Sequence, residues 1–191
     1  MFLSSLIILS LSYKLEVIKG KFEFESYATT LGFIPHTIKG YQENVEGVIV
    51  YEDEIKGEIR FPTFFNTGNT RRDRDVANIL NFRNYPYIII KPLNLKKDDA
   101  EKILGFRKGG ILLPLTLKIN GKEKTYEFEI FFEWVKSDVI KFQTEKIIKF
   151  TDFGIDPPSI KGLGFFGKIV TGARDELKIK GEVSFKVKKE E

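Results

Sequence analysis

Apolar and polar side chains alternate along most of the chain with the period of two that is typical of a β-strand. Between Ile111 and Ile119 every second residue is apolar, and the same holds between Tyr126 and Trp134. Runs of this kind, together with one continuous apolar run at 87–95, cover residues 21–26, 45–52, 55–65, 87–95, 111–119, 125–134, 139–150 and 176–188. The pattern therefore predicts roughly eight strands, while residues 31–40 carry the Gly-Phe and Ile-Pro breaks of a bend.

The predicted strands each have one apolar and one charged face, which is the pattern of antiparallel sheets with one solvent-facing side. Their number and length favour an all-β fold, an antiparallel up-and-down barrel whose interior is filled by side chains or holds one small ligand. A β-sandwich is the competing fold, because periodicity alone does not choose between the two. Asn120-Gly121 predicts a type I′ hairpin turn, and residues 98–104 are expected to form one or two helical turns.

The period of two breaks off between residues 66 and 86, where charge is also densest. Residues 71–75 are all charged, and apolar residues at helical spacing follow within 76–82. We expect a short helix that begins with Asp75 as its N-cap and ends before Pro86, since proline disfavours the helical conformation of the residue before it. Such an insert is typical of a plug or lid on a β structure. The alternative is a solvated loop whose Arg and Asp side chains pair with one another.

The composition and charge of the chain narrow the chemistry that it can carry. Its 191 residues predict one domain, and its 18 Phe residues favour a pleated surface. Net charge is +4, but acidic and basic residues mix along the strands, which argues against a nucleic-acid-binding stripe. With no Cys and only His36, the sequence excludes a disulfide framework and metal sites that need several His or Cys ligands. No serine has the glycine pattern of a nucleophile elbow, so we expect no catalytic residue, no metal and no cofactor.

Residues 162–167 match the spacing of a dinucleotide-binding glycine motif, but their context is wrong. Pro157-Pro158 precede the glycines and a β-type run follows, whereas a dinucleotide site needs a strand before the motif and a helix after it. The glycines are instead expected to fold a tight loop that presents Phe165 and Phe166.

The first twelve residues form an apolar segment as long as the core of a signal peptide. Residues 2–11 carry no charged side chain, and Ser10-Leu11-Ser12 offers a cleavage position between small residues. The segment is too short to span a bilayer as a helix, and no other run is long enough. We expect a signal peptide at 1–12 and hence a periplasmic or secreted protein. The alternative is an apolar tail or first strand on a cytoplasmic protein.

Short motifs follow one another along the chain in an order that resembles the YceI-like proteins. Around the insert the matching motifs are Thr67-Gly68-Asn69, Arg72-Asp73, Asn81-Phe82 and Tyr85-Pro86. Further matches, in the order of the family, are Leu31-Gly32-Phe33, Gly40, Val45, Gly47, Leu115-Thr116-Leu117, Gly121, Lys124, Asp152-Phe153-Gly154-Ile155, and Asp175-Glu176-Leu177 with Ile179. The resemblance covers nearly all of the chain after Tyr13, which we expect to be a single domain at 13–191.

The resemblance implies a lipocalin-like antiparallel barrel, exported to the periplasm, whose internal tunnel holds a polyisoprenoid chain or a related amphiphile. It implies no catalytic activity, and it implies that Arg72 and Asp73 form a clasp at the barrel rim, paired to backbone or to each other. The chain departs from the family at Thr30 and Asp75, where the family has His, and the segment before Pro86 is shorter. The polar contacts at the tunnel mouth are therefore not carried over from the family.

We therefore expect a protein that binds an amphiphilic lipid, such as a quinone or another prenyl lipid, for storage, shielding or transport. Each CH₂ moved from water into such a tunnel gains about 0.8 kcal/mol, so a long chain needs no strong polar anchor. The candidate lining residues are Phe24, Ile49, Tyr51, Phe61, Leu115, Leu117, Phe128, Ile130, Phe132, Trp134, Phe165 and Phe166. For each of them ordinary core packing is the alternative, because 18 Phe side chains can also fill a barrel.

Two functions of other classes stay open. One is an enzyme that acts on a lipid-like substrate through a carboxylate such as Asp73 or Asp152, which a buried, unpaired carboxylate beside the tunnel would favour. The other is a barrel with a filled interior that binds a partner protein, or a second copy as a homodimer, through an exposed strand edge.

Overall fold

The structure, a computed structural model, describes residues 12–30, 34–52, 54–157, 159–162 and 169–190. These residues form ten strands, two α-helices and one turn of 3₁₀ helix, η1. The elements are β1 (Ser12–Thr30), β2 (Ile34–Gln42), β3 (Glu46–Tyr51), β4 (Ile55–Pro62), α1 (Thr70–Ile79), β5 (Tyr87–Pro92), α2 (Lys97–Gly105), β6 (Lys108–Ile119), β7 (Lys122–Lys136), β8 (Val139–Lys149), η1 (Thr151–Phe153), β9 (Ser159–Gly162) and β10 (Ile169–Glu190). Neither helix of this described part has the length and apolar character needed to cross a membrane.

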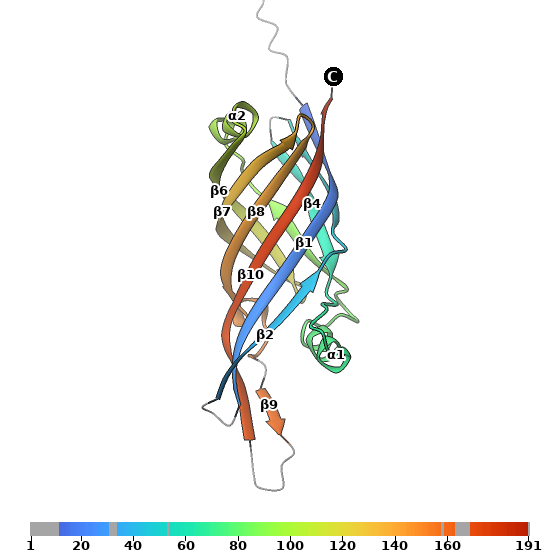
Figure 1. Cartoon of the computed structure of the whole chain (residues 1–191), viewed down its shortest axis with the longest axis vertical. Coiled ribbons are helices and arrows are strands. Elements are labelled where there is room, and N and C mark those ends of the chain that lie inside the picture. Colours follow the sequence, from blue (N-terminus) through green and yellow to red (C-terminus); the bar gives the residue numbers. More distant parts are fainter. Residues whose placement is uncertain (1–11, 31–33, 53, 158, 163–168, 191) are drawn as a thin grey trace, which may run out of the picture.

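Pairing between the first and last strands closes the sheet into a barrel (Figure 1). Eight antiparallel strands follow one another around the ring in the order β1-β3-β4-β5-β6-β7-β8-β10. The closing ladder runs from the pair Ser12 and Glu190 to the pair Thr29 and Gly172. The predicted eight-stranded antiparallel barrel with two short helices is confirmed, and the β-sandwich alternative is wrong because one sheet closes on itself.

β1 is much longer than the strand predicted at 21–26. It pairs with β10 along most of its length, with β3 near its start and with β2 over its second half. The register shifts between Val17 and Lys19 and again between Ser26 and Ala28. Each shift breaks the alternation of the sequence, so the period of two was visible only between them. β2 occupies most of the stretch in which the sequence predicted a bend.

β6 and β7 show the predicted alternation of inner and outer faces. Their buried inward side chains are Ile111, Leu113, Leu115, Leu117, Ile119, Phe128, Ile130 and Phe132. The turn between the strands has positive φ at both central residues, 50° at Asn120 and 72° at Gly121, as a type I′ turn requires. The predicted hairpin is therefore confirmed.

Three inward-facing Phe rings each lean over a glycine of the neighbouring strand. The pairs, which are opposite one another in the strand register, are Phe22 with Gly181, Phe24 with Gly40, and Phe132 with Gly109. A Cβ atom added to these glycines would lie 2.7, 2.4 and 2.9 Å from the nearest atom of the ring. Only a glycine therefore leaves room for the ring to lie against the neighbouring strand. A ring in this position extends less far toward the centre of the barrel.

α1 begins earlier than the sequence predicted. Its N-cap is Asn69, whose side-chain oxygen accepts hydrogen bonds at 3.0 and 3.1 Å from two backbone N–H groups of the first turn. Asp75 lies inside the helix, so its assignment as the N-cap was wrong; the turn at Gly68, with φ of +75°, brings Asn69 into capping position. The helix ends before Pro86 as expected, but already at Ile79, so the turn at Asn81, whose φ is 55°, comes before the proline can act. α2 lies where the sequence predicted a short helix.

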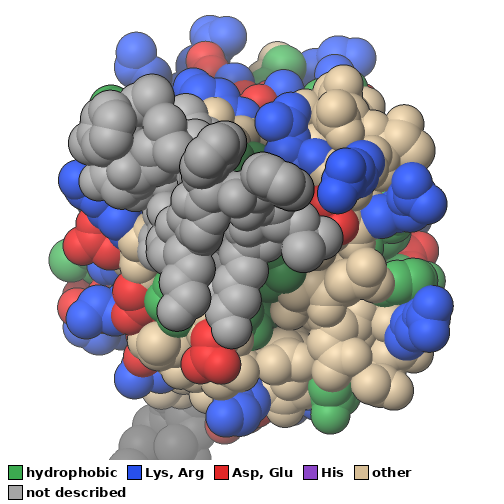
Figure 2. Space-filling view, turned by 90° about the horizontal axis from the view of Figure 1, so that it is seen from below, with side chains coloured by type: hydrophobic (Ala, Val, Ile, Leu, Met, Phe, Trp, Pro, Cys, Tyr) green, Lys and Arg blue, Asp and Glu red, His purple; other side chains and the backbone are tan. Residues whose placement is uncertain are grey.

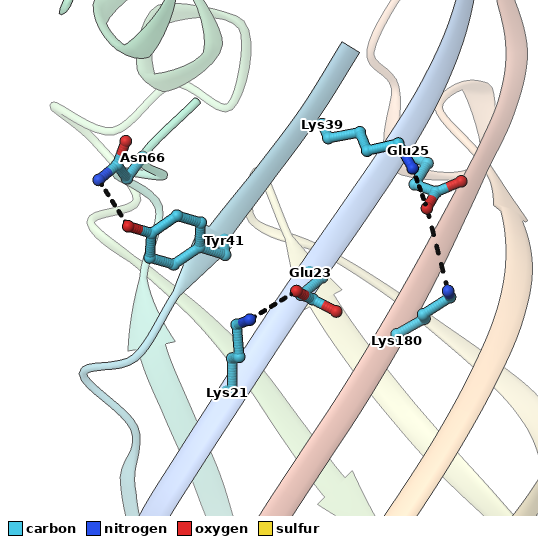
Figure 3. A network of polar contacts seen from close by, with 7 residues as sticks. All are labelled: Lys21, Glu23, Glu25, Lys39, Tyr41, Asn66 and Lys180. Carbon is cyan, nitrogen blue, oxygen red and sulfur yellow. Dashed lines mark hydrogen bonds and ion pairs between the residues drawn. The ribbon is translucent and has the colours of Figure 1, made fainter. Parts of the chain in front are cut away.

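An ion-pair network on the outer face ties β1 to β2 and β10 (Figure 3). The Glu25 carboxylate accepts a hydrogen bond from Lys39 Nζ of β2 at 3.0 Å and lies 3.9 Å from Lys180 Nζ of β10. Farther along β2, the Tyr41 hydroxyl accepts a hydrogen bond from Asn66 Nδ2 at 2.9 Å. The hydrogen bond from Lys39 holds the pKa of Glu25 below its ordinary value of 4.5. The ionised form of Glu25 therefore favours the folded barrel.

We predict that Glu25→Gln lowers the free energy of unfolding at pH 7 by about 0.5 kcal/mol, the usual worth of an exposed ion pair. Because the pKa of Glu25 is lower in the folded state, its contribution is present above pH 4.5 and is lost as the pH falls further. Urea unfolding of both proteins at pH 7, 5, 4 and 3 measures this difference.

The matched control is Glu127→Gln on the outer face of β7, where the carboxylate forms no ion pair with another described residue. This variant should unfold like the parent protein at every pH. The stabilising role of Glu25 would be contradicted if Glu25→Gln and the parent protein had the same free energy of unfolding at pH 7. It would also be contradicted if the difference between them were as large at pH 3 as at pH 7.

Candidate functional site

An upper cavity lies inside the barrel at the α2 end and has a volume of about 160 Å³. Its wall comes from the strands of the ring and from Ala100, Ile103 and Leu104 of α2. Nearly all lining side chains are aliphatic or aromatic, and the Trp134 Nε1 among them donates a hydrogen bond to the Ile103 carbonyl oxygen at 2.7 Å. The lining of the upper cavity is therefore almost entirely apolar, as a site for an apolar chain requires.

A lower cavity lies at the α1 end and is larger, about 480 Å³. α1 turns Val76 and Ile79 toward it, and the inner faces of the strands supply the rest of its apolar wall. Unlike the upper cavity, it also has charged and polar lining residues; those of α1, its N-cap and β8 are Asn69, Arg71, Arg72, Asp75 and Lys149. Seen from this end, Lys and Arg side chains stand around much of the periphery of the molecule (Figure 2).

An aromatic pair marks the boundary between the two cavities. Phe22 and Ile90 line both cavities, whereas Phe61 lines the lower one. The rings of Phe22 and Phe61 are stacked, with centroids 4.1 Å apart and planes 12° from parallel. On its other side Phe22 leans over Gly181. An apolar chain that occupied both cavities would pass beside Phe22 and Ile90, which line both.

The predicted clasp residues both bind Thr67, which follows β4. Asp73 Oδ1 accepts hydrogen bonds from the backbone N–H of Thr67 at 2.7 Å and from its hydroxyl at 2.6 Å. Arg72 donates from Nε to the Thr67 hydroxyl at 3.0 Å and from Nη2 to the Thr67 carbonyl at 2.7 Å. These four contacts fix the first turn of α1 against the segment that joins it to β4, and with it the wall that α1 gives to the lower cavity.

Most of the described candidate lining residues lie on one of the two cavity walls. Those on the upper wall are Ile49, Tyr51, Leu115, Ile130 and Trp134, and those on the lower wall are Phe24, Phe61 and Leu117. Phe128 and Phe132 line neither cavity: Phe128 packs edge-on against Tyr126 and Phe132 leans over Gly109, so both are ordinary core residues. Phe165 and Phe166 lie outside the described residues.

Sequence reasoning missed two parts of the walls. Phe22 belongs to the same alternating run as Phe24, so the period of two carried the signal for it. The α2 residues carried no such signal, because a short helix gives no indication of which cavity it covers. Their contribution depends on the connection from β5 to β6, which brings α2 over the end of the barrel.

The half-buried carboxylates Asp73 and Asp152 are both engaged, and neither lines a cavity. Asp152 accepts a hydrogen bond from the Tyr126 hydroxyl at 2.5 Å and lies 3.6 Å from Lys124 Nζ. Burial, and then the hydrogen bond to Asp152, raises the pKa of Tyr126, so its hydroxyl remains a donor even in alkaline solution. Among the described residues, no three His, Asp or Glu side chains are grouped as metal ligands would be.

Solved structures with a similar fold include three bacterial proteins. A polyisoprenoid binding domain from Saccharophagus degradans, implicated in plant cell wall breakdown, has a TM-score of 0.69 and 12% identity, over 93% of this chain and 99% of that one. BcnA from Burkholderia cenocepacia has a TM-score of 0.59 and 16% identity, over 86% and 95%. The YCEI protein of Campylobacter jejuni has a TM-score of 0.53 and 18% identity, over 81% and 85%. At such identities the likeness shows the fold.

No curated protein matches the chain significantly in sequence. The sequence model of one family, the YceI-like domain, matches residues 13–188, which include the barrel from the start of β1 almost to the end of β10. By this match, which agrees with the closed barrel and with the order of its motifs, the chain belongs to the YceI-like family.

Proposed function

We propose that this protein binds a polyisoprenoid or a related amphiphilic lipid, a quinone or prenyl lipid, inside its barrel for storage, shielding or transport. The observation that carries the proposal is the pair of apolar cavities that meet at Phe22. The fold is shared with a domain from Saccharophagus degradans that is described as polyisoprenoid binding, which supports the same class of ligand.

The two cavities suit the two ends of an amphiphile differently. Burial of an apolar tail gains about 0.8 kcal/mol per CH₂, so the wall itself supplies most of the binding free energy. A polar headgroup would lie at the lower cavity, where Arg71, Arg72 and Lys149 are among the lining residues. The tail would extend past Phe22 and Phe61 into the upper cavity, whose lining is almost wholly apolar.

The other functions that the sequence left open have less support. The enzyme alternative called for a buried, unpaired carboxylate beside the tunnel. Asp73 is bonded to Thr67 and Asp152 to Tyr126, and Asp75, which lines the lower cavity, is exposed to solvent. A structural barrel with a filled interior is disfavoured by a lower cavity of about 480 Å³, a volume within the range of ligand sites. Export to the periplasm is part of the proposal and depends on the segment at 1–12, of which residues 1–11 lie outside the described residues.

Bound lipid provides the first test. We predict that the protein, purified without detergent from its own host, carries a lipid that native mass spectrometry detects as a discrete added mass and that solvent extraction releases. The control is protein stripped by extraction and refolded, which should regain the mass when it is incubated with host lipid. Repeated recovery of the bare polypeptide mass from the host would contradict the proposal.

The boundary between the cavities provides the second test. In Gly181→Ala the new Cβ, on the wall of the upper cavity, would lie 2.7 Å from Phe22. The Phe22 ring, already stacked on Phe61 at 4.1 Å, therefore has less room to move aside for a chain that extends into both cavities. We predict that affinity for solanesol, a long prenyl alcohol, falls about tenfold, the effect of losing roughly two buried CH₂ groups. Affinity for the short prenyl alcohol farnesol, which fits the lower cavity alone, should fall by a much smaller factor, because Phe22 is one of many residues on that wall. Fluorescence competition measures both.

The matched control is Gly110→Ala, because a Cβ at Gly110 would meet only ordinary contacts of 3.6 Å with the Phe131 ring. It should bind both alcohols like the parent protein. The role given to the aromatic pair would be contradicted if Gly181→Ala lost affinity for both alcohols equally, or lost affinity for neither.

A further inference from the structure

Three apolar side chains are exposed to solvent where α2 joins the barrel. Leu104, Phe106 and Val135 have exposed fractions of 40%, 62% and 52%. The Arg107 carbonyl oxygen accepts a hydrogen bond from the Trp134 backbone N–H at 2.8 Å, and this contact continues the β6–β7 ladder by one pair. Phe106 and Val135 are therefore opposite each other just beyond the ladder. We call Leu104, Phe106 and Val135 the α2 patch.

Basic side chains flank the α2 patch on its own segments. They are Lys102, Arg107, Lys108 and Lys136. The acidic residues of the same segments are Asp98 and Asp99 in the first turn of α2, Glu101, and Glu133. Glu101 lies 3.8 Å from Lys97, and Glu133 lies 3.9 Å from Lys141, so each of them has its own basic partner. The charge next to the exposed Phe and Val is therefore mainly positive.

The α2 patch and the upper cavity lie on two sides of the same short segment. Leu104 belongs to both, because its partly exposed side chain also lines the cavity together with Ala100 and Ile103. One hydrogen bond, from Trp134 Nε1 to the Ile103 carbonyl, holds this end of α2 against β7. Figure 1 places α2 at the end of the barrel opposite to α1. The part of the interior next to the α2 patch is therefore the upper cavity, in which the proposed ligand has its apolar tail.

We propose that the α2 patch docks the protein onto an anionic phospholipid bilayer. The inference rests on the proposed function, since it identifies the surface from which a lipid ligand is taken up or to which it is returned. Exposed Phe, Leu and Val side chains flanked by Lys and Arg are the combination that binds anionic membrane surfaces, with the apolar groups in the interface and the cations near the lipid phosphates. A bilayer satisfies both parts of the patch, and it is also the source of a prenyl lipid.

Co-sedimentation with vesicles tests the docking. Full-length protein should bind phosphatidylcholine vesicles that contain phosphatidylglycerol, bind weakly to pure phosphatidylcholine, and be released from the anionic vesicles by high salt. Phe106→Ser combined with Val135→Ser should lower the bound fraction on anionic vesicles at least about tenfold, because both apolar groups are lost from the interface.

The matched control is Phe64→Ser combined with Ile147→Ser, which removes a Phe and a β-branched residue that are 45% and 57% exposed elsewhere on the barrel. It should bind vesicles like the parent protein. Equal loss in both double variants, or retained binding by the Phe106 and Val135 variant, would overturn the proposal. A third outcome would also overturn the proposal: the parent protein forms a dimer without vesicles, and only the Phe106 and Val135 variant loses that dimer. The patch would then bind a second copy of the chain.

A second readout separates this inference from the proposed function. Neither Phe106 nor Val135 lines a cavity, so the double variant should bind farnesol in solution with unchanged affinity. Loss of farnesol binding in this variant would indicate that the barrel itself is damaged and would overturn the assignment to docking. Parent protein that binds anionic vesicles but no prenyl alcohol would contradict the proposed function and leave the docking surface in place.

Discussion

The ladder between β1 and β10 is the constraint on which the rest of the structure depends. It joins the first and last strands of the ring, so no edge strand of the ring is left unpaired and an interior exists at all. Each strand then presents one face to water and one to this interior, and the charged outer face adds contacts such as Glu25 with Lys180 across the seam. The closure thus converts an alternating sequence into an enclosed apolar space.

Closure alone does not decide whether that space is open or filled. Large Phe side chains point inward, but Phe22, Phe24 and Phe132 each lean over a glycine of the adjacent strand. The rings then take up space along the wall, and two cavities remain. The ends of the barrel differ as well: α1 brings polar and charged groups to the lower cavity, and α2 gives the upper cavity a further apolar wall. This asymmetry is what an amphiphile with one polar end requires.

The sequence was sufficient where structure is local. The alternation in β6 and β7 and the Asn120-Gly121 turn predicted a hairpin that the structure confirms, and motif order indicated the family. It was insufficient where the structure depends on distant residues. The register of Phe22 with Gly181 joins positions at opposite ends of the chain, so no local pattern could show that the ring is drawn aside. The helix start was missed because the Gly68 turn makes Asn69 the cap, although Asp75 has equal intrinsic capping ability.

The central claim is that the apolar interior holds a lipid chain across the boundary formed by Phe22 and Phe61. A crystal structure of protein purified from its own host without detergent tests it most directly. We expect continuous, elongated density from the α1 end into the upper cavity, with the two rings no longer stacked. Stacked rings with no elongated density on either side, or side chains that fill both cavities, would contradict the account.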